Sequence, residues 1–210
     1  MLSGDESGKR CRVKLNLFEK LITNNPVRAY IQRHVEGPAL KKMGSQKDYR
    51  LCLEIGCGAG IGAQVIAEQF GAQKVIATDI DPDQIESARD NLRPEYKDKI
   101  EFRLEDAMSL DEPDETFDAV FSFGVLHHME DWKKAVREIS RVLKHGGELF
   151  FEEPFRPFLN NFLVRSLTAH PEGGEFDYEE FKTELQKNNI DILSMRRIRD
   201  IAIFCVGRKK

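Results

Sequence analysis

The hydrophobic residues in the middle of the chain form short continuous runs that alternate with amphipathic segments. Such runs are typical of strands buried on both faces, and apolar residues spaced three and four apart are typical of covering helices. The pattern predicts strands at residues 51–55, 74–79, 100–104, 117–123 and 148–151, and helices at 61–70, 81–92 and 132–143. Strands that alternate with helices pair in parallel through right-handed crossovers. We therefore expect an α/β fold, a doubly wound three-layer sandwich.

Two helices are expected before the first strand. Apolar positions recur at helical spacing between residues 16 and 43, and the pattern is broken at Asn24, Asn25 and Pro26. Asn25 can cap the second helix, because its side chain can accept a backbone N–H, and Pro26 suits the first turn. Asp81 is expected to cap the helix at 81–92 in the same way. The positions that set this spacing are Leu17, Leu21, Ile22, Val27, Tyr30, Ile31, His34 and Val35.

The order of elements changes after Pro154. A loop or helical insert is expected up to about residue 177, followed by a helix at 178–188 and strands at 190–198 and 201–207. Arg199 and Asp200 are the whole connection between those two strands, and a turn that short can join only antiparallel neighbours. The expected sheet is therefore parallel, with an antiparallel strand added at the C-terminal end.

Composition limits the classes of protein that the chain can represent. With 210 residues, 40% of them hydrophobic and 32% charged, it matches a single soluble globular domain. No apolar stretch reaches the roughly 18 residues of a membrane span, and a formal net charge of -4 provides no basic surface to attract nucleic acid. Residues 1–15 have no apolar signal core, so we expect a flexible tail and a cytoplasmic location.

The four cysteines show neither a CxxC pair nor the spacing of a zinc site, so we expect reduced thiols and no metal. They are Cys11, Cys52, Cys57 and Cys205. Cys57 lies within a glycine-rich turn, where it is either a small apolar filler or a reactive thiol. The filler is favoured, because no basic neighbour is evident that would lower its pKa.

The most informative segment is the first predicted strand and the turn after it, with the sequence LCLEIGCGAGIG at residues 51–62. Glycines at every second position allow the backbone to approach a ligand closely. The next strand ends in Asp79, where a nucleotide-binding βαβ unit places the carboxylate that binds ribose hydroxyls. Two such signals at this spacing indicate a ligand that contains adenosine.

Two ligand classes fit this geometry. Gly58, Gly60 and Ala63 also match the dinucleotide fingerprint, so a nicotinamide-type cofactor is an alternative. Glu54 precedes the glycines, and its charge would repel a pyrophosphate but attract a sulfonium-bearing amino acid tail. The sequence therefore favours the sulfonium ligand.

Five motifs in order make residues 49–154 resemble the class I S-adenosylmethionine-dependent methyltransferases, in particular the small-molecule branch of the type 11 kind. They are LEIGCGAG at 53–60, ATDI at 77–80, EDA at 105–107, FDAVFSFGVLHH at 117–128 and RVLKHGGEL at 141–149. The resemblance implies a Rossmann-like seven-stranded sheet with an antiparallel C-terminal strand. It also implies S-adenosylmethionine as cofactor and S-adenosylhomocysteine as product.

On the methionine side, the family implies that Glu54 holds the amino acid end, directly or through water. The backbone near Phe123 and Gly124 would touch the methionine amino group. The turn that permits close approach would consist of Gly56, Cys57, Gly58 and Gly60.

On the adenosine side, the resemblance implies that Asp79 accepts both ribose hydroxyls and that Ile80 packs on the adenine face. Asp106 and the N–H of Ala107 would read the adenine edge. Asp106 has an alternative interpretation, because an acid after a strand often only starts a turn.

The candidate catalytic residues are His127, His128 and Glu153. Methyl transfer is an in-line displacement that depends mainly on alignment, so a base is optional. A histidine at the end of the fourth strand could take a proton from the acceptor, or could simply pack over the cofactor. Glu152 and Glu153 follow the fifth strand at the ligand-binding edge, where either could orient an acceptor, deprotonate it, attract an amine or remain solvated.

The sequence thus predicts one methyltransferase domain that transfers methyl from S-adenosylmethionine to a small-molecule acceptor. Its expected parts are the tail 1–15, a helical cover 16–48, a cofactor core 49–153, a substrate-side insert 154–178, and a helix with a β-hairpin at 179–210. Aromatic residues with interspersed cations in the cover and insert suit an apolar or aromatic acceptor with an anionic group, or a lid that packs on itself. A nicotinamide-dependent oxidoreductase and a non-catalytic adenosyl-binding module are the alternatives. The acceptor and the oligomeric state are left open.

Overall fold

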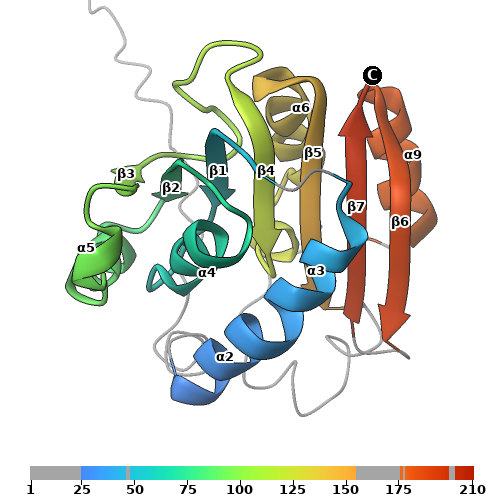
Figure 1. The fold of residues 1–210 in the computed structure, drawn as a ribbon. Coiled ribbons are helices and arrows are strands. Elements are labelled where there is room, and N and C mark those ends of the chain that lie inside the picture. Colours follow the sequence, from blue (N-terminus) through green and yellow to red (C-terminus); the bar gives the residue numbers. More distant parts are fainter. Residues whose placement is uncertain (1–24, 46–47, 155–175, 177, 199–201) are drawn as a thin grey trace, which may run out of the picture.

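The computed structural model describes residues 25–45, 48–154, 176, 178–198 and 202–210. Within them, seven strands form one sheet in the order β3-β2-β1-β4-β5-β7-β6 (Figure 1). β7 runs antiparallel to both of its neighbours, β5 and β6, and the other pairs are parallel. The predicted fold class is therefore confirmed. The strands are β1 Leu51–Ile55, β2 Lys74–Asp79, β3 Ile100–Leu104, β4 Phe117–Phe123, β5 Leu143–Pro154, β6 Ile190–Ile198 and β7 Ala202–Lys209.

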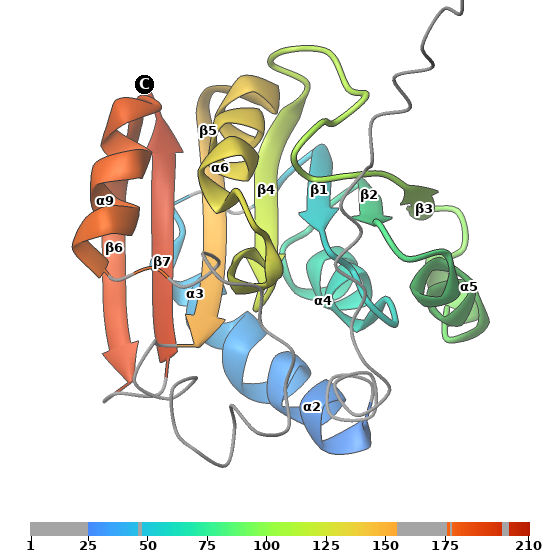
Figure 2. The ribbon, with the colours of Figure 1, turned by 180° about the vertical axis from the view of Figure 1, so that it is seen from behind.

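Helices cover both faces of the sheet, which gives three layers (Figures 1 and 2). The N-terminal helical segment consists of α2 Pro26–Ile31, the π-helix η1 Gln32–Glu36 and α3 Gly37–Met43. It shares one face with α4 Ile61–Gln69 and α5 Pro82–Asp90, whereas α6 Trp132–Val142 and α9 Tyr178–Lys187 lie on the other. Short 3-10 turns are η2 Pro94–Tyr96 and η3 Leu126–His128.

Alternate residues of β5 supply the two cores, because successive strand side chains point to opposite faces. Phe150 stacks on Phe121, with ring centroids 4.7 Å apart, in the core beneath α3 and α4. Phe151 stacks on Phe181 at 4.1 Å in the core beneath α6 and α9. Both faces of the central strands are therefore buried, and the packing on both sides fixes the positions of their carboxyl ends.

The expected helix caps are present. Asn25 Oδ1 accepts the N–H of Arg28 at 2.9 Å, and Asp81 Oδ1 accepts the N–H of Asp83 at 3.1 Å. Each cap satisfies one of the backbone donors that a helix start leaves without a partner. Residues 1–24, the insert at 155–175 and the turn at 199–201 lie outside the described part of the chain, as do the tail and first helix predicted there.

Two expectations about individual elements are wrong. β5 begins at Leu143 and not at residue 148, so Gly146 and Gly147 lie inside the strand, at a register shift where Gly146 has φ +75°. Between the pairs Phe117–Leu143 and Ala119–Glu148, β5 has three residues more than β4, and glycine can adopt the left-handed backbone of such a bulge. The sequence shows the glycines without showing the pairing partner.

The second correction concerns the residues that the N-terminal helical segment buries. The apolar spacing favours burial of its apolar residues, but Val27 is 67% exposed and Tyr30 is 63% exposed, whereas Gln32 and Glu36 are 8% and 6% exposed. The segment is helical as predicted, and its buried side is polar up to Glu36 and apolar at Leu40 in α3.

Three cysteines of the described chain, Cys52, Cys57 and Cys205, are buried free thiols, and Cys11 lies outside that part. No helix among the described residues combines the length and the hydropathy that crossing a bilayer requires.

Candidate functional site

The turn after β1 is built from left-handed glycines. Gly56, Gly58 and Gly60 have φ of +61°, +52° and +78°, a region that residues with a Cβ rarely adopt. The Cys57 N–H donates to the carbonyl of Thr78 at 2.8 Å, and this bond ties the turn to β2. The sequence prediction of a tight strand-to-helix turn at this point is thus matched by the backbone geometry.

Glu54 lies at the end of β1 with its carboxyl group 1% exposed. It packs against the start of α4: a Cβ on Gly62 would lie 1.8 Å from Glu54 Oε1, so glycine is required there. The Ala63 N–H donates to this carboxyl, but Oε2 has no hydrogen-bond partner among the described residues. Burial, and then the nearby charge of Asp79, raise the pKa of Glu54 well above its usual value. A buried carboxyl with one unused oxygen fits a cationic ligand group, such as the ammonium of a methionine tail.

Asp79 lies at the end of β2, beside the turn. Its Oδ2 accepts the Gly58 N–H and its Oδ1 accepts the Asp81 N–H, both at 2.9 Å. Burial raises the pKa of Asp79, and these backbone donors oppose the rise. Each carboxylate oxygen has a second lone pair that can accept a hydroxyl. Ile80, half-buried, follows directly in the chain.

Asp106 and Ala107 form a tight corner after β3. Asp106 Oδ1 accepts the Met108 N–H at 2.8 Å, and its carbonyl accepts the Ser109 N–H at 2.8 Å. The acid therefore does start a turn, as its alternative interpretation expects, and a ligand could use only the remaining lone pairs. Ala107 is buried.

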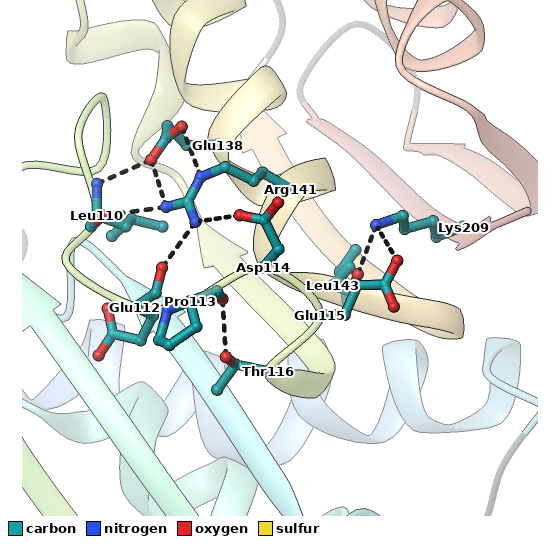
Figure 3. Close-up of polar contacts among 10 residues, drawn as sticks. All are labelled: Leu110, Glu112, Pro113, Asp114, Glu115, Thr116, Glu138, Arg141, Leu143 and Lys209. Carbon is teal, nitrogen blue, oxygen red and sulfur yellow. Dashed lines mark hydrogen bonds and ion pairs between the residues drawn. The ribbon is translucent and has the colours of Figure 1, made fainter.

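Arg141 of α6 holds the loop that follows this corner (Figure 3). Its guanidinium donates to the carbonyls of Leu110 and Glu112 at 3.0 and 2.7 Å, and to Asp114 at 2.9 Å. Glu138 accepts from Arg141 at 2.8 Å and also from the Leu110 N–H at 3.0 Å. The hydrogen bonds with Glu138 and then Asp114 raise the pKa of Arg141, so the loop is clamped by a permanent cation.

Phe123 and Gly124 end β4 beside β5. The Gly124 N–H donates to the carbonyl of Glu152 at 2.7 Å, and Gly124 has φ +68°. This bend directs the chain into η3, which carries both candidate histidines.

His127 and Glu153 form a buried pair behind this bend. His127 Nδ1 lies 2.5 Å from Glu153 Oε2, while Glu153 Oε1 accepts the N–H groups of Val125 at 2.6 Å and Leu126 at 2.7 Å. Glu153 has no exposed surface, so it is placed to orient His127 rather than to reach an acceptor itself. His128 packs against His127, with ring centroids 3.9 Å apart and the ring planes tilted by 40°.

A second polar group, which the sequence analysis missed, lies where the N-terminal helical segment crosses the carboxyl end of β5. Arg28 contacts the carboxylate of Glu36 closely and lies 3.4 Å from Glu152 Oε2. Gln32, midway between Arg28 and Glu36 on the helix, approaches Glu54: its Nε2 is 2.9 Å from the position of a Cβ on Gly62. The available signal was the spacing of four between three polar residues.

These features match the group that the sequence resemblance implies. Glu54 supplies a buried acceptor for a cation, the glycines keep side chains away from the turn, and Asp79 ends the neighbouring strand. The Cys57 thiol is buried, and burial raises its pKa well above the usual value, so its contribution is the backbone of the turn. Among the described residues, no group of three or more His, Cys, Asp or Glu side chains is arranged to hold a metal ion.

Comparison with known proteins supports the family that the sequence resembles. A family model described as a methyltransferase domain matches residues 53–151. The methyltransferase GfsG of Streptomyces halstedii is 39% identical over 98 residues, which cover 46% of this chain and 35% of that protein. The 27-O-demethylrifamycin SV methyltransferase of Amycolatopsis mediterranei is 35% identical over 146 residues, which cover 68% of this chain and 48% of that protein. The chain thus spans less than half the length of either relative.

Solved structures agree on the fold. A methyltransferase from Aquifex aeolicus, described as dependent on S-adenosylmethionine, superposes with a TM-score of 0.73 at 17% identity, covering 92% of this chain and 98% of that one. The YcgJ protein from Bacillus subtilis gives a TM-score of 0.68 at 19% identity, covering 84% and 98%.

Proposed function

We propose that the chain is a class I S-adenosylmethionine-dependent methyltransferase that transfers a methyl group from this cofactor to a small-molecule acceptor. The match of residues 53–151 to a methyltransferase domain supports this proposal. The observation that carries the proposal is Glu54: a fully buried carboxyl with an unused oxygen, beside a glycine turn and one strand from Asp79. A pyrophosphate at this turn would meet that buried acid, which disfavours the nicotinamide alternative.

The chain's own residues would bind and orient the cofactor. Glu54 would hold the methionine ammonium, Asp79 the ribose hydroxyls, and the corner at Asp106 and Ala107 the adenine edge. When bound, S-adenosylmethionine supplies an activated methyl group on a sulfonium, which needs alignment more than chemical assistance. The frame of β1, β4 and β5 would supply that alignment, because both of its faces are packed.

His127 is the better candidate base of the two histidines, and Glu153 the residue that positions it. A carboxylate can only accept hydrogen bonds, so the contact at 2.5 Å requires a proton on His127 Nδ1. The neutral ring then carries its lone pair on Nε2. This arrangement suits an acceptor whose hydroxyl, thiol or amine loses a proton during transfer.

The acceptor class follows from the family and from the site. The relative from Amycolatopsis mediterranei is named for a small natural product, which supports a small molecule here as well. The N-terminal helical segment would cover the acceptor at the carboxyl ends of β4 and β5.

Three ligands test the proposal. Calorimetric titration of the purified chain with S-adenosylhomocysteine, S-adenosylmethionine and NADH should show binding of the first two only. Incubation with methyl-labelled S-adenosylmethionine and a panel of small hydroxyl, thiol and amine compounds should then label at least one. Binding of NADH alone would favour an oxidoreductase, and cofactor binding without labelling of any compound would favour a non-catalytic module.

A further inference from the structure

The inward side of the N-terminal helical segment is polar in its first part, from Arg28 to Glu36. Arg28, Gln32 and Glu36 are spaced by four, so they project from one side of the helix. The segment lies across the end of the sheet toward which β4 and β5 point (Figures 1 and 2). In this part the apolar residues Val27 and Tyr30 are exposed instead, whereas Leu40 in α3 is buried in the core. A helix that buries polar groups in place of apolar ones forgoes hydrophobic stabilisation, so this side of the helix is built for a polar contact.

Within the described part of the chain, the Arg28 guanidinium acts on four buried carboxyl groups, of which Glu153 is already hydrogen-bonded to His127 and to two backbone N–H groups. The other three carboxyl groups have no such set of partners. Glu36, Glu54 and Glu152 are 6%, 1% and 7% exposed. Arg28 is the basic side chain that acts on both Glu54 and Glu152. One cation cannot neutralise three buried carboxylates, and uncompensated charge in a dry site is costly.

Glu152 is the carboxyl with the weakest compensation. Arg28 contacts Glu36 more closely than it contacts Glu152, which it reaches at 3.4 Å. Burial, followed by the negative charge of Glu36, raises the pKa of Glu152 well above its usual value, and Glu153 adds to the rise while Arg28 opposes it. His127 also faces this region, because its Cε1 and Glu152 Oε2 both lie within 4.0 Å of the position of a Cβ on Gly124.

The cofactor does not remove the whole excess of negative charge. S-adenosylmethionine carries an ammonium, a carboxylate and a sulfonium, and so has a net charge of about +1 near neutral pH. When all three carboxyl groups are ionised, they, one guanidinium and this ligand still leave one negative charge. Glu54 faces the start of α4, whereas Glu152 lies beside the end of β4, so under the proposed function Glu54 would serve the cofactor and Glu152 would remain for the acceptor.

We propose that Glu36 and Glu152, held by Arg28, form a subsite for a cationic group of the acceptor, most simply a primary or secondary ammonium. This inference rests on the proposed function and specifies its substrate class. Of the roles that the sequence analysis leaves open for Glu152, it selects the attraction of an amine. It disfavours the anionic acceptor group considered there, because a carboxylate or phosphate placed here would meet several acids. The proposal concerns recognition, so the methylated atom need not be the ammonium nitrogen.

The test uses the full chain saturated with S-adenosylhomocysteine and a library of matched fragments. Each triplet has one skeleton that bears an ammonium, a hydroxyl or a carboxylate, for example 2-phenylethylamine, 2-phenylethanol and phenylacetate. Binding is measured by ligand-observed NMR and calorimetry at about pH 8, where alkylamines, with a pKa near 10, are still cationic. We expect the amine of at least one triplet to bind about tenfold or more tightly than its alcohol, and the carboxylates not to compete.

Variants assign the effect to this subsite. Glu152→Gln and Glu36→Gln should each reduce the preference for the amine to about threefold or less. The matched control is Glu95→Gln, which replaces an exposed carboxylate paired with Arg93 and should leave the preference unchanged. In the wild type, amine affinity should rise with pH as Glu152 ionises, because burial raises the pKa of this carboxyl above its usual value. Thermal unfolding of each variant shows whether it is folded.

The outcomes separate the two proposals. Failure to bind S-adenosylhomocysteine contradicts the proposed function. If that ligand binds, the subsite is refuted by a preference for alcohols or carboxylates, by the binding of no amine, or by an amine preference that persists in both variants.

Discussion

Replacing Glu153 tests whether this carboxylate both stabilises the fold and sets the tautomer of His127. In Glu153→Ala, the N–H groups of Val125 and Leu126 and the Nδ1 of His127 all lose their acceptor, at a site with no exposed surface. Each hydrogen bond to a charged group is worth about 1.5–3 kcal/mol, and such contributions do not add fully. Removing one partner of a buried pair typically costs about 3–5 kcal/mol, which is the loss of unfolding free energy that we expect.

Glu153→Gln keeps the shape and removes only the charge. The amide oxygen can still accept from Val125 and Leu126, so the expected loss is about 1–2 kcal/mol. The amide NH₂ then faces His127 Nδ1, which must become an acceptor, and the ring proton moves to Nε2. If Nε2 acts as the base, transfer to a hydroxyl acceptor should slow by about 100-fold or more, with affinity for S-adenosylhomocysteine unchanged.

Two measurements check this reasoning. Urea unfolding gives the free energies, with Glu95→Gln as an exposed control that should change stability by less than about 0.5 kcal/mol. Long-range ¹H–¹⁵N correlation of the imidazoles reports the tautomer directly. The reasoning is refuted if His127 carries its proton on Nε2 in the wild type, or if Glu153→Ala is as stable as Glu153→Gln.

Three further predictions concern the turn, the ribose acid and the corner after β3. Asp79→Asn should weaken S-adenosylhomocysteine binding by about tenfold or more, because the amide offers only one acceptor oxygen; calorimetry at equal thermal stability checks it. Gly56→Ala should lose about 2 kcal/mol or more in urea unfolding, since φ is +61° and the new Cβ would lie 2.4 Å from Val125 Cγ1; an unchanged midpoint would contradict this. Burial, and then Glu112, raise the pKa of Glu105 to about 7, so the unfolded chain releases this proton near pH 4.5 and the folded chain only near 7. Stability should therefore fall as pH rises through that interval, by about 1 kcal/mol after allowance for solvent screening, and the fall should be absent in Glu105→Gln.

Much of the fold could be predicted from the sequence because its signals are local. The bounds of β1, β2, β3 and β4 match the predicted strands. Strands buried on both faces, such as β1 and β4, are mostly apolar, whereas the edge strand β3 alternates apolar and charged residues. Asn25 and Asp81 cap helices as expected, because a cap needs only the backbone of the next turn. The same holds for the turn at Gly60, whose left-handed φ of +78° only glycine adopts readily.

The candidate site could be predicted only in part, because spacing along the chain does not show which side chains meet. Asp79 and Glu54 follow from the order of the strands, since parallel neighbours bring their carboxyl ends to one edge. The sequence around β5 does not show that Glu153 is buried against His127. It also does not show that Glu152, the preceding residue, faces Arg28. Alternation along β5 separates those two acids, but which face is covered by which helix depends on the packed sheet.

The N-terminal helical segment shows most clearly which features the sequence determined and which only the tertiary structure decided. Its periodicity determined that it is helical, because the spacing of side chains and the Asn25 cap are properties of the segment itself. Its orientation was decided only by tertiary structure: Arg28 and Glu36 turn inward because Glu152 lies there, 116 residues beyond Glu36 in a chain of 210. Electrostatic contacts between residues so far apart in the chain leave no pattern in the local sequence. Either face of an amphipathic helix can be buried if the rest of the fold provides a polar partner for its polar face.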